Sequence, residues 1–188
     1  PSRPIIPMAA IALAPRQCLM RAMADIRSIV ILTGAGISAE SGIDTFRAEG
    51  GLWEQHRVED VATPEAFERD PELVLRFYDM RREAIQTKHP NPAHQALARL
   101  DREWKGELLI VTQNVDDLHE RAGSDVVSHL HGSLFAPRCS VCGTPYDGPG
   151  AFPDPGDTGT APDDPRVDPP TCPRCGGKVR PGIVWFGE

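Results

Sequence analysis

The sequence predicts an α/β protein: a parallel β-sheet with a small cysteine-rich module inserted late in the chain. Three observations support this prediction. Two short runs of β-branched and aliphatic residues, 29–32 and 108–112, are typical of buried parallel strands. A glycine-rich turn follows the first run directly. Two Cys-x-x-Cys pairs follow the second run, after residue 138.

The glycine-rich turn is Gly34-Ala35-Gly36-Ile37-Ser38, and it should open into a helix. Glycine permits a positive φ and leaves no Cβ between the backbone and a ligand. The amides of such a turn, with the positive end of the helix behind them, can bind a pyrophosphate. The pattern matches the Gly-x-Gly-x-x-Ala form of the dinucleotide fingerprint, ending at Ala39, and so predicts a Rossmann-like sheet. A purely structural turn without a ligand is the alternative.

The region after this turn differs from that of a standard nicotinamide dehydrogenase. Such enzymes carry an acidic residue on a second strand, about 20 residues after the turn. Here residues 50–56 are Gly-Gly-Leu-Trp-Glu-Gln-His, which indicates a loop. The sequence therefore argues against a standard hydride-transfer site.

Length and charge restrict the class of protein further. The 188 residues suffice for one domain with a small insertion. A formal net charge of −7, with no basic stripe, argues against nucleic-acid binding. No apolar run reaches the roughly 18 residues of a membrane helix. We therefore expect neither a nucleic-acid nor a membrane partner.

Residues 1–23 are expected to form a disordered extension. They contain a short apolar piece that faintly resembles a secretory signal, but Pro4, Pro7 and Pro15 interrupt it. The absence of acidic residues before Asp25 leaves organellar targeting as a minor alternative. We expect a cytoplasmic protein, or a mitochondrial one if the source is eukaryotic.

Three residue pairs predict helix starts in the middle of the chain. Thr63-Pro64, Asp70-Pro71 and Asn91-Pro92 each combine an N-cap residue with proline at the first helical position. The helices are expected at about 64–69, 71–87 and 92–104.

Tyr78 and Arg81 share one face of the second of these helices, because they are three residues apart. A phenol beside a guanidinium suits a carboxylate, which accepts two hydrogen bonds from arginine and one from the hydroxyl. The alternative is an ordinary amphipathic helix with a half-buried tyrosine and an arginine that reaches out to solvent.

A polar segment, Gln113-Asn114-Val115-Asp116, follows the second predicted strand directly. Open α/β sheets bind ligands at the carboxyl ends of their parallel strands. Asn114 and Asp116 could therefore hold a carboxamide and ribose hydroxyls. Alternatively, Asp116 or Asp117 merely caps the helix that ends near Gly123.

Residues 126–132 resemble a third strand, with His131 at its exit. Histidine titrates near neutrality, which suits proton abstraction. His131 is the best placed of the six histidines. A structural role for this side chain remains the alternative.

The cysteine pairs are the strongest local signal. Cys139 and Cys142, and again Cys172 and Cys175, are spaced so that both sulfurs of a pair reach one ion. Four thiolates fill a tetrahedral Zn²⁺ shell and leave no open position, so the predicted site is structural. Cys18 is left over. An odd count with this spacing favours a metal in a reducing compartment over disulfides.

Taken in order, these motifs resemble the sirtuins, the NAD-dependent protein-lysine deacylases. The order is the glycine turn, Thr45-Phe46-Arg47, Gln113-Asn114-Val115-Asp116, His131-Gly132, the cysteine pairs and Val184-Trp185-Phe186-Gly187-Glu188. The resemblance runs from about Ile26 to Glu188.

The resemblance implies NAD as the cofactor, His131 as the general base and Asn114 as a second catalytic residue. It also implies that Phe46 and Arg47 form a loop that screens the reaction centre. The products would be free lysine, nicotinamide and O-acyl-ADP-ribose. The resemblance assigns these residues to NAD: Gly34, Ala35, Gly36, Ser38, Ala39, Thr45, Phe46, Arg47, Trp53, Gln113, Asn114, Val115 and Asp116.

The resemblance further implies acyl-lysine substrates, whether acetyl, succinyl or malonyl. Ala62, Tyr78 and Arg81 match the class that accepts acidic acyl groups: Tyr78 and Arg81 would grip the distal carboxylate, and small Ala62 would widen the pocket. A main-chain pairing mode would bind the substrate peptide. The residues implied for it are Val184, Phe186, Gly187 and Glu188.

The expected organisation follows from these assignments. Residues 1–23 are the extension, 24–136 the NAD-binding domain with a helical insertion at about 48–90, 137–180 the zinc-binding module, and 181–188 a return strand. No residues match the later strands of the family. We therefore expect the C-terminal part of the Rossmann domain to be absent, an apolar sheet edge and face to be exposed, and the chain alone to be weakly stable with weak or no activity.

Two other functions remain open on the sequence. A protein ADP-ribosyltransferase on the same fold would share the NAD site but would not explain Tyr78 and Arg81. A non-catalytic, zinc-stabilised fragment would have the cysteine module without NAD affinity.

Overall fold

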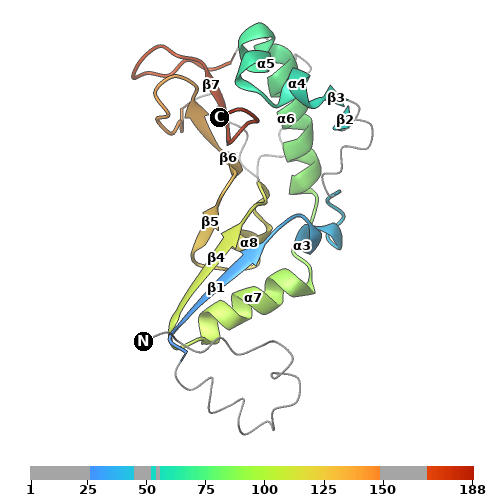
Figure 1. Ribbon diagram of the computed structural model, residues 1–188, viewed down its shortest axis with the longest axis vertical. Helices are drawn as coiled ribbons and strands as arrows, with labels where there is room; N and C mark the ends of the chain where they lie inside the picture. The colour runs from blue at the N-terminus through green and yellow to red at the C-terminus, as the bar shows by residue number, and fades with distance from the viewer. Residues whose placement is uncertain (1–25, 45–51, 54–55, 149–168) are drawn as a thin grey trace, which may run out of the picture.

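The computed structural model describes residues 26–44, 52–53, 56–148 and 169–188 (Figure 1). The extension predicted for residues 1–23 lies outside the described residues. So do Thr45, Phe46 and Arg47 of the predicted cofactor site.

A three-stranded parallel sheet forms one end of the molecule, as predicted (Figure 1). Its order is β1 (Ser28–Thr33), β4 (Glu107–Thr112) and β5 (Val127–His129). The register aligns Thr33 with Thr112, and Thr112 with His129. All three strands therefore end at one edge, where the polar segments that follow them meet. β5 is shorter than the predicted run because a turn at residues 130–131 separates it from β6 (Gly132–Cys139).

The buried strand expected at residues 29–32 is covered on one face only. Ile29 and Ile31 are half-buried, whereas Val30 and Leu32 are 67% and 64% exposed. β1 is an edge strand of the described sheet, and the helix α7 (Pro92–Glu103) lies along this sheet in Figure 1. Exposed and half-buried residues alternate along β1 because no described element covers the second face of the sheet. This face forms the exposed apolar surface that the sequence predicted.

The segment between β1 and β4 is mostly helical. The expected loop at residues 50–56 contains part of a short antiparallel ribbon, which corrects the prediction of a simple loop. The ribbon and helices that follow β1 are α3 (Gly36–Ala39), β2 (Leu52–Trp53), β3 (His56–Arg57), α4 (Val58–Val61), α5 (Pro64–Arg69) and α6 (Pro71–Gln86). None of the described helices is long and apolar enough to cross a bilayer.

All three predicted helix starts are confirmed by side-chain caps. The Thr63 hydroxyl accepts from the amide of Ala66, and the Asp70 carboxylate accepts from the amide of Leu73. The Asn91 side chain accepts two amides of α7, and the His94 ring completes a capping box. Each side chain satisfies amides that the first turn leaves without a helical partner.

The main apolar core lies between the helices α4 to α6 and an antiparallel pair of strands, β6 and β7 (Val179–Ile183), rather than on the parallel sheet. Figure 1 shows this helical layer and the β6–β7 pair at the opposite end of the molecule from β1 and α7. The largest core members are Phe67, Phe77, Tyr78, Leu134, Ile183 and Trp185. The space between this core and the parallel sheet is where the predicted site residues gather.

Candidate functional site

A cavity of about 570 Å³ lies at the carboxyl end of the parallel sheet, facing α6 and the segment after β7. Such edges are where α/β proteins bind ligands. Predicted site residues that line this cavity are Ala35, Ser38, Ala62, Tyr78, Arg81, Gln113, Asn114, Val115, Asp116, His131, Val184, Phe186 and Gly187. The cavity thus unites residues predicted for cofactor, catalysis and substrate.

Other predicted residues do not line it. The turn residues Gly34, Gly36 and Ala39 are adjacent in sequence to lining residues but are not part of the wall. Glu188 also lies outside the cavity lining. The side chain of Trp53 is not among the described ones.

Ser38 connects two polar side chains on the cavity floor. Its hydroxyl donates to the Asp116 carboxylate at 3.0 Å and accepts from the Asn114 side-chain amide at 3.0 Å. All three residues are buried. The second oxygen of Asp116 accepts from the amide of Leu118, the first residue of α8 (Leu118–Arg121), at 3.1 Å. Asp116 therefore both caps a helix and faces the cavity, so the two predictions for this residue are compatible.

His131 has the geometry of a general base. Its Nδ1 lies 3.0 Å from the carbonyl oxygen of Gln113, to which only an N–H can donate. In the neutral ring, Nδ1 therefore carries the proton and Nε2 keeps a lone pair. His131 is exposed and lines the cavity. A neutral imidazole held in this tautomer can accept a proton from a hydroxyl in the cavity.

Gly132 explains why the chain can turn immediately after His131. Its φ is +71°, and a Cβ at this position would lie 2.0 Å from the carbonyl oxygen of Gly182. Only glycine fits both the conformation and the space. The His-Gly pair thus fixes the histidine at the junction of β5 and β6.

The glycine turn differs from the prediction in one respect. Neither Gly34 nor Gly36 has a positive φ, so neither is needed for an unusual backbone conformation. A Cβ at either position would meet nothing within 4 Å. What these glycines provide is open space in front of the backbone, which allows the close approach of a ligand.

Tyr78 and Arg81 project from α6 into the same cavity as His131. Tyr78 is 1% exposed, so it is not the half-buried tyrosine of an ordinary amphipathic helix. Its hydroxyl accepts from the Trp185 indole N–H at 3.2 Å. Burial raises the pKa of Tyr78 well above that of an ordinary tyrosine, so the hydroxyl keeps its proton.

The segment after β7 forms another wall of the cavity. The amide of Val184 donates to the carbonyl of His131 at 2.8 Å, and the amide of Phe186 donates to the carbonyl of Ala62 at 3.0 Å. The side chains of Val184 and Phe186 are exposed. Glu188 instead folds back, and its carboxylate accepts from Arg180, Arg138 and the amide of Trp185. These bonds of Glu188 hold in place the turn that forms this wall of the cavity.

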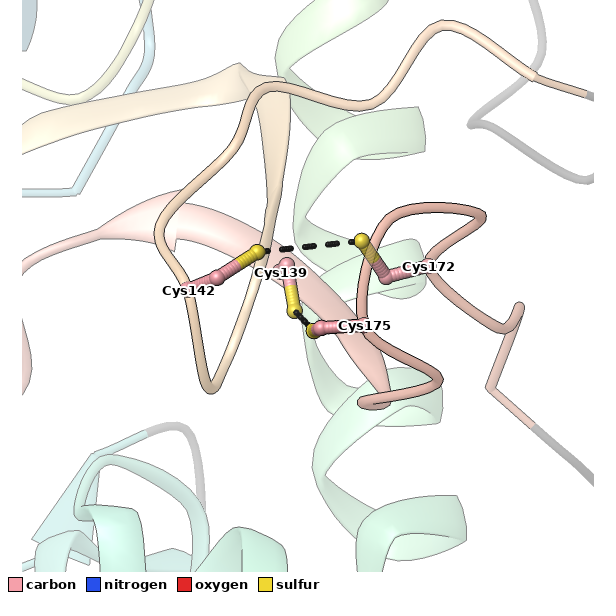
Figure 2. A group of neighbouring side chains, drawn as sticks. All are labelled: Cys139, Cys142, Cys172 and Cys175. Atoms are coloured by element: carbon pink, nitrogen blue, oxygen red, sulfur yellow. Dashed lines mark hydrogen bonds between the residues drawn. The ribbon is translucent and has the colours of Figure 1, made fainter.

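The four predicted metal ligands come together beside β7 (Figure 2). Their sulfur atoms all lie within 4.8 Å of one another. Figure 2 shows Cys139 paired with Cys175, and Cys142 paired with Cys172. The sulfur atoms are 3.5 Å apart in the first pair and 3.8 Å apart in the second. These donors fit a tetrahedral Zn²⁺ ion with no open position, which makes the site structural.

The turns around these cysteines suit a metal. Gly143 and Gly176, which follow the second cysteine of each pair, have φ values of +67° and +74°. A hydrogen bond to the Thr144 hydroxyl, at 3.2 Å, is the main cause that lowers the pKa of Cys142 to about 6. The thiolate is the form that binds metal.

Comparison with known proteins identifies the class. The sequence profile of the Sir2 family matches residues 34–188, so the chain belongs to the Sir2 family. It is 52% identical over 174 residues to NAD-dependent protein deacylase 1 of Pseudomonas aeruginosa, covering 92% of this chain and 67% of that one. It is 51% identical over 171 residues to the NAD-dependent protein deacylase of Methylococcus capsulatus, covering 90% and 65%.

Solved structures of Sir2 homologues support the same family membership. A Sir2 homologue in complex with NAD superposes with a TM-score of 0.70 at 46% identity, covering 92% of this chain and 62% of that one. The chain therefore spans about two thirds of the length of these relatives. The predicted Rossmann-like fold and the zinc-type cysteine cluster are confirmed.

Several residues around the cavity were not predicted as site residues. Ile43, Ile85 and Trp185 line it, and His129 lies behind its floor. Ile43 and Ile85 carry no chemical signal in the sequence. Trp185 lies within segment 184–188, which the resemblance assigned to the substrate peptide, and that position was the one available indication.

Proposed function

We propose that this chain forms the catalytic and acyl-lysine-binding part of an NAD-dependent protein-lysine deacylase. The observation that carries the proposal is one cavity that holds His131, with a lone pair at Nε2, beside the buried Asn114–Ser38–Asp116 network. Membership of the Sir2 family and relatives named as NAD-dependent protein deacylases support it.

The residues of the cavity fit NAD. Asn114 and Asp116 offer a side-chain amide and a carboxylate for a carboxamide and ribose hydroxyls. The open turn at Gly34 and Gly36 leaves room for a pyrophosphate. When bound, NAD would supply an electrophilic ribose carbon and nicotinamide as the leaving group.

His131 would accept the proton of a ribose hydroxyl at Nε2, while the Gln113 carbonyl holds the ring by Nδ1. The Val184–Phe186 segment would lie beside the substrate backbone, since the side chains of both residues are exposed next to the cavity. The acyl chain would then enter between Ala62 and Tyr78.

The proposal extends to acyl groups with a distal carboxylate, such as succinyl and malonyl, besides acetyl. Tyr78 and Arg81 both line the cavity, where they would face the acyl group. A protonated phenol and a guanidinium can donate to one carboxylate. A buried carboxylate without such donors would be strongly disfavoured.

The test is nicotinamide release by the zinc-loaded chain, measured with NAD and an acetyl- or succinyl-lysine peptide. Release should require both reactants. His131→Ala should lower it by about 10²- to 10⁴-fold, the usual contribution of a general base. His89→Ala is the control, because His89 is exposed in the connection between α6 and α7. Release that does not depend on the acyl peptide would overturn the proposal.

Transfer of labelled ADP-ribose to protein without acyl-lysine would instead favour the ADP-ribosyltransferase alternative. Zinc binding without NAD affinity would favour the non-catalytic alternative. We also propose a reducing compartment, the cytoplasm, because the four thiols hold zinc only in their reduced form.

A further inference from the structure

His129 stands behind the cavity floor, at the end of β5, and does not line the cavity. Both of its ring nitrogens face an oxygen. Nδ1 lies 2.8 Å from the carbonyl oxygen of Asn114, and Nε2 lies 2.7 Å from a carboxylate oxygen of Glu120 on α8. A neutral imidazole carries one N–H and can donate only one of these bonds, whereas an imidazolium donates both.

The surroundings favour the charged form of His129. The bond to Glu120 is the main cause that raises the pKa of His129, although burial opposes it, and Asp116 also raises it. Burial has the largest single effect on the pKa of Glu120 and raises it, but the bond to His129, a backbone hydrogen bond and the charges of His129 and His119 together outweigh it, so the net shift is downward. The two partners therefore shift in the directions expected of an ion pair. The remaining titratable neighbour, His119, is buried and has a lowered pKa, so it adds little positive charge.

The Asn114 carbonyl belongs to a run of four successive carbonyls that the β5–β6 segment holds. Backbone amides take the two outer ones: Leu130 donates to Thr112 at 2.9 Å, and Leu134 donates to Val115 at 3.0 Å. The two inner carbonyls are bonded by histidine rings: the Gln113 carbonyl by Nδ1 of His131, and the Asn114 carbonyl by Nδ1 of His129. The chain turns at residues 130–131, and among the described residues no turn or loop amide bonds these two carbonyls.

Asn114 is thereby fixed at three points. Its amide donates to the Thr112 hydroxyl at 3.0 Å, its carbonyl accepts from His129, and its side chain donates to Ser38. Without the His129 contact, the peptide after Asn114 could rotate. Rotation would move the side chains of Asn114 and Asp116, which share Ser38.

We infer that His129, as an imidazolium ion paired with Glu120, is a positioning residue that holds the Asn114 backbone and so keeps the Asn114–Ser38–Asp116 floor in its binding geometry. The kinetic consequence rests on the proposed function. The two histidines then need opposite states, since His131 must be neutral to accept a proton and His129 must be charged to donate twice. Binding at the floor should weaken as pH rises through the His129 transition.

The first experiment is NMR titration of the zinc-loaded chain with ¹⁵N- and ¹³C-labelled histidine and asparagine. His129 should have protons on both ring nitrogens at neutral pH and should titrate above the ordinary histidine pKa of about 6.5. The ¹³C shift of the Asn114 carbonyl should follow the same midpoint. Glu120→Gln should lower that midpoint toward the ordinary histidine value of about 6.5. A His129 midpoint at or below that ordinary value, or an Asn114 carbonyl shift that does not change across the titration, would overturn the inference.

The second experiment separates positioning from chemistry. His129→Gln, which can donate only from its amide, should raise the KM for NAD by about 10-fold, the loss of one hydrogen bond to a charged donor, with a smaller change in kcat. It should also remove the alkaline decline in kcat/KM. His89→Gln should leave both parameters and the pH profile unchanged. A loss confined to kcat would overturn the inference. A wild-type chain that shows the NMR coupling but releases no nicotinamide would count against the proposed function. It would still support the positioning role of His129.

Discussion

Trp185 donates its indole N–H to the hydroxyl of Tyr78 at 3.2 Å, across 107 residues of sequence. Arg180 on β7 stacks over the Trp185 ring, with its guanidinium carbon 4.0 Å from the ring centroid. The Arg180 guanidinium also bonds Glu188 and the carbonyl of Ile183. The Tyr78 side of the cavity is thus joined to β7, the strand that returns from the cysteine module.

Tyr78→Phe should destabilise the chain by about 1–3 kcal/mol, because it leaves the buried Trp185 N–H without its acceptor. Urea denaturation measures the change. The same substitution should lower the free energy of unfolding by less in a Trp185→Phe background, because phenylalanine has no N–H that would lose its acceptor. Equal costs in both backgrounds would show that the hydrogen bond contributes nothing and would contradict the prediction.

Tyr78→Phe combined with Arg81→Met should lower desuccinylation by about 10- to 100-fold while sparing deacetylation, since only the succinyl group loses charged hydrogen bonds. The measurement is kcat/KM on matched acetyl- and succinyl-lysine peptides. Arg76→Met is the control, because Arg76 is exposed on the same helix and lies outside the cavity. Equal losses on both peptides would reject the carboxylate role.

Ser38→Ala should destabilise the chain by about 1–3 kcal/mol and weaken NAD binding, because it removes the shared partner of the buried Asn114 amide and Asp116 carboxylate. Ser128 is the exposed residue of β5, so Ser128→Ala should change the free energy of unfolding by less than about 0.5 kcal/mol. Urea denaturation and calorimetric titration with NAD test both. A Ser38 variant as stable as the Ser128 variant would contradict the network.

Local signals in the sequence predicted much of the fold. Caps at Thr63, Asp70 and Asn91 depend on neighbours within three residues, so the sequence alone specified those helix starts. The cysteine spacing likewise predicted the cluster at one place in the fold.

Features that depend on long-range pairing were missed. The role of His129 requires the parallel register that brings it opposite Thr112, and no local pattern encodes that register. The sequence predicted an exposed apolar sheet face, but not that Val30 and Leu32 would form part of it, because that depends on which elements cover β1. The main apolar core joins α4 to α6 to the β6–β7 pair, a long-range contact that no local pattern specifies.

The cysteine cluster should bind one Zn²⁺ ion per chain, measured by atomic absorption. Cys175→Ser should abolish this binding and make residues 139–180 more susceptible to protease, because it removes one of the four thiolates of a tetrahedral site whose metal contributes folding energy. Ser140→Ala, in the same turn as Cys139, should retain the ion. Zinc retained by Cys175→Ser would contradict a four-thiolate site.

Two buried histidines, one on α7 and one on α8, pack against each other. His94 and His119 are 0% and 1% exposed, and their rings meet edge to face with centroids 5.0 Å apart. Burial lowers the pKa of each, and the neighbouring His94 lowers that of His119 further. Both rings are therefore neutral in the folded chain, where His94 Nδ1 accepts from the Asn91 amide and His119 Nε2 bonds the Thr33 hydroxyl.

These rings gain protons on unfolding below the ordinary histidine pKa of about 6.5, so the unfolded chain binds more protons there. Their contribution to stability is complete above that pH and is lost as pH falls toward their lowered values. His129 has the opposite sign, because its raised pKa stabilises the fold at low pH and loses that effect as pH rises. His119→Gln, which keeps an amide near Thr33, should flatten the acidic decline of the unfolding free energy between about pH 5 and 7, and His89→Gln should not. An unchanged slope in His119→Gln would show that the buried pair does not set the acid sensitivity.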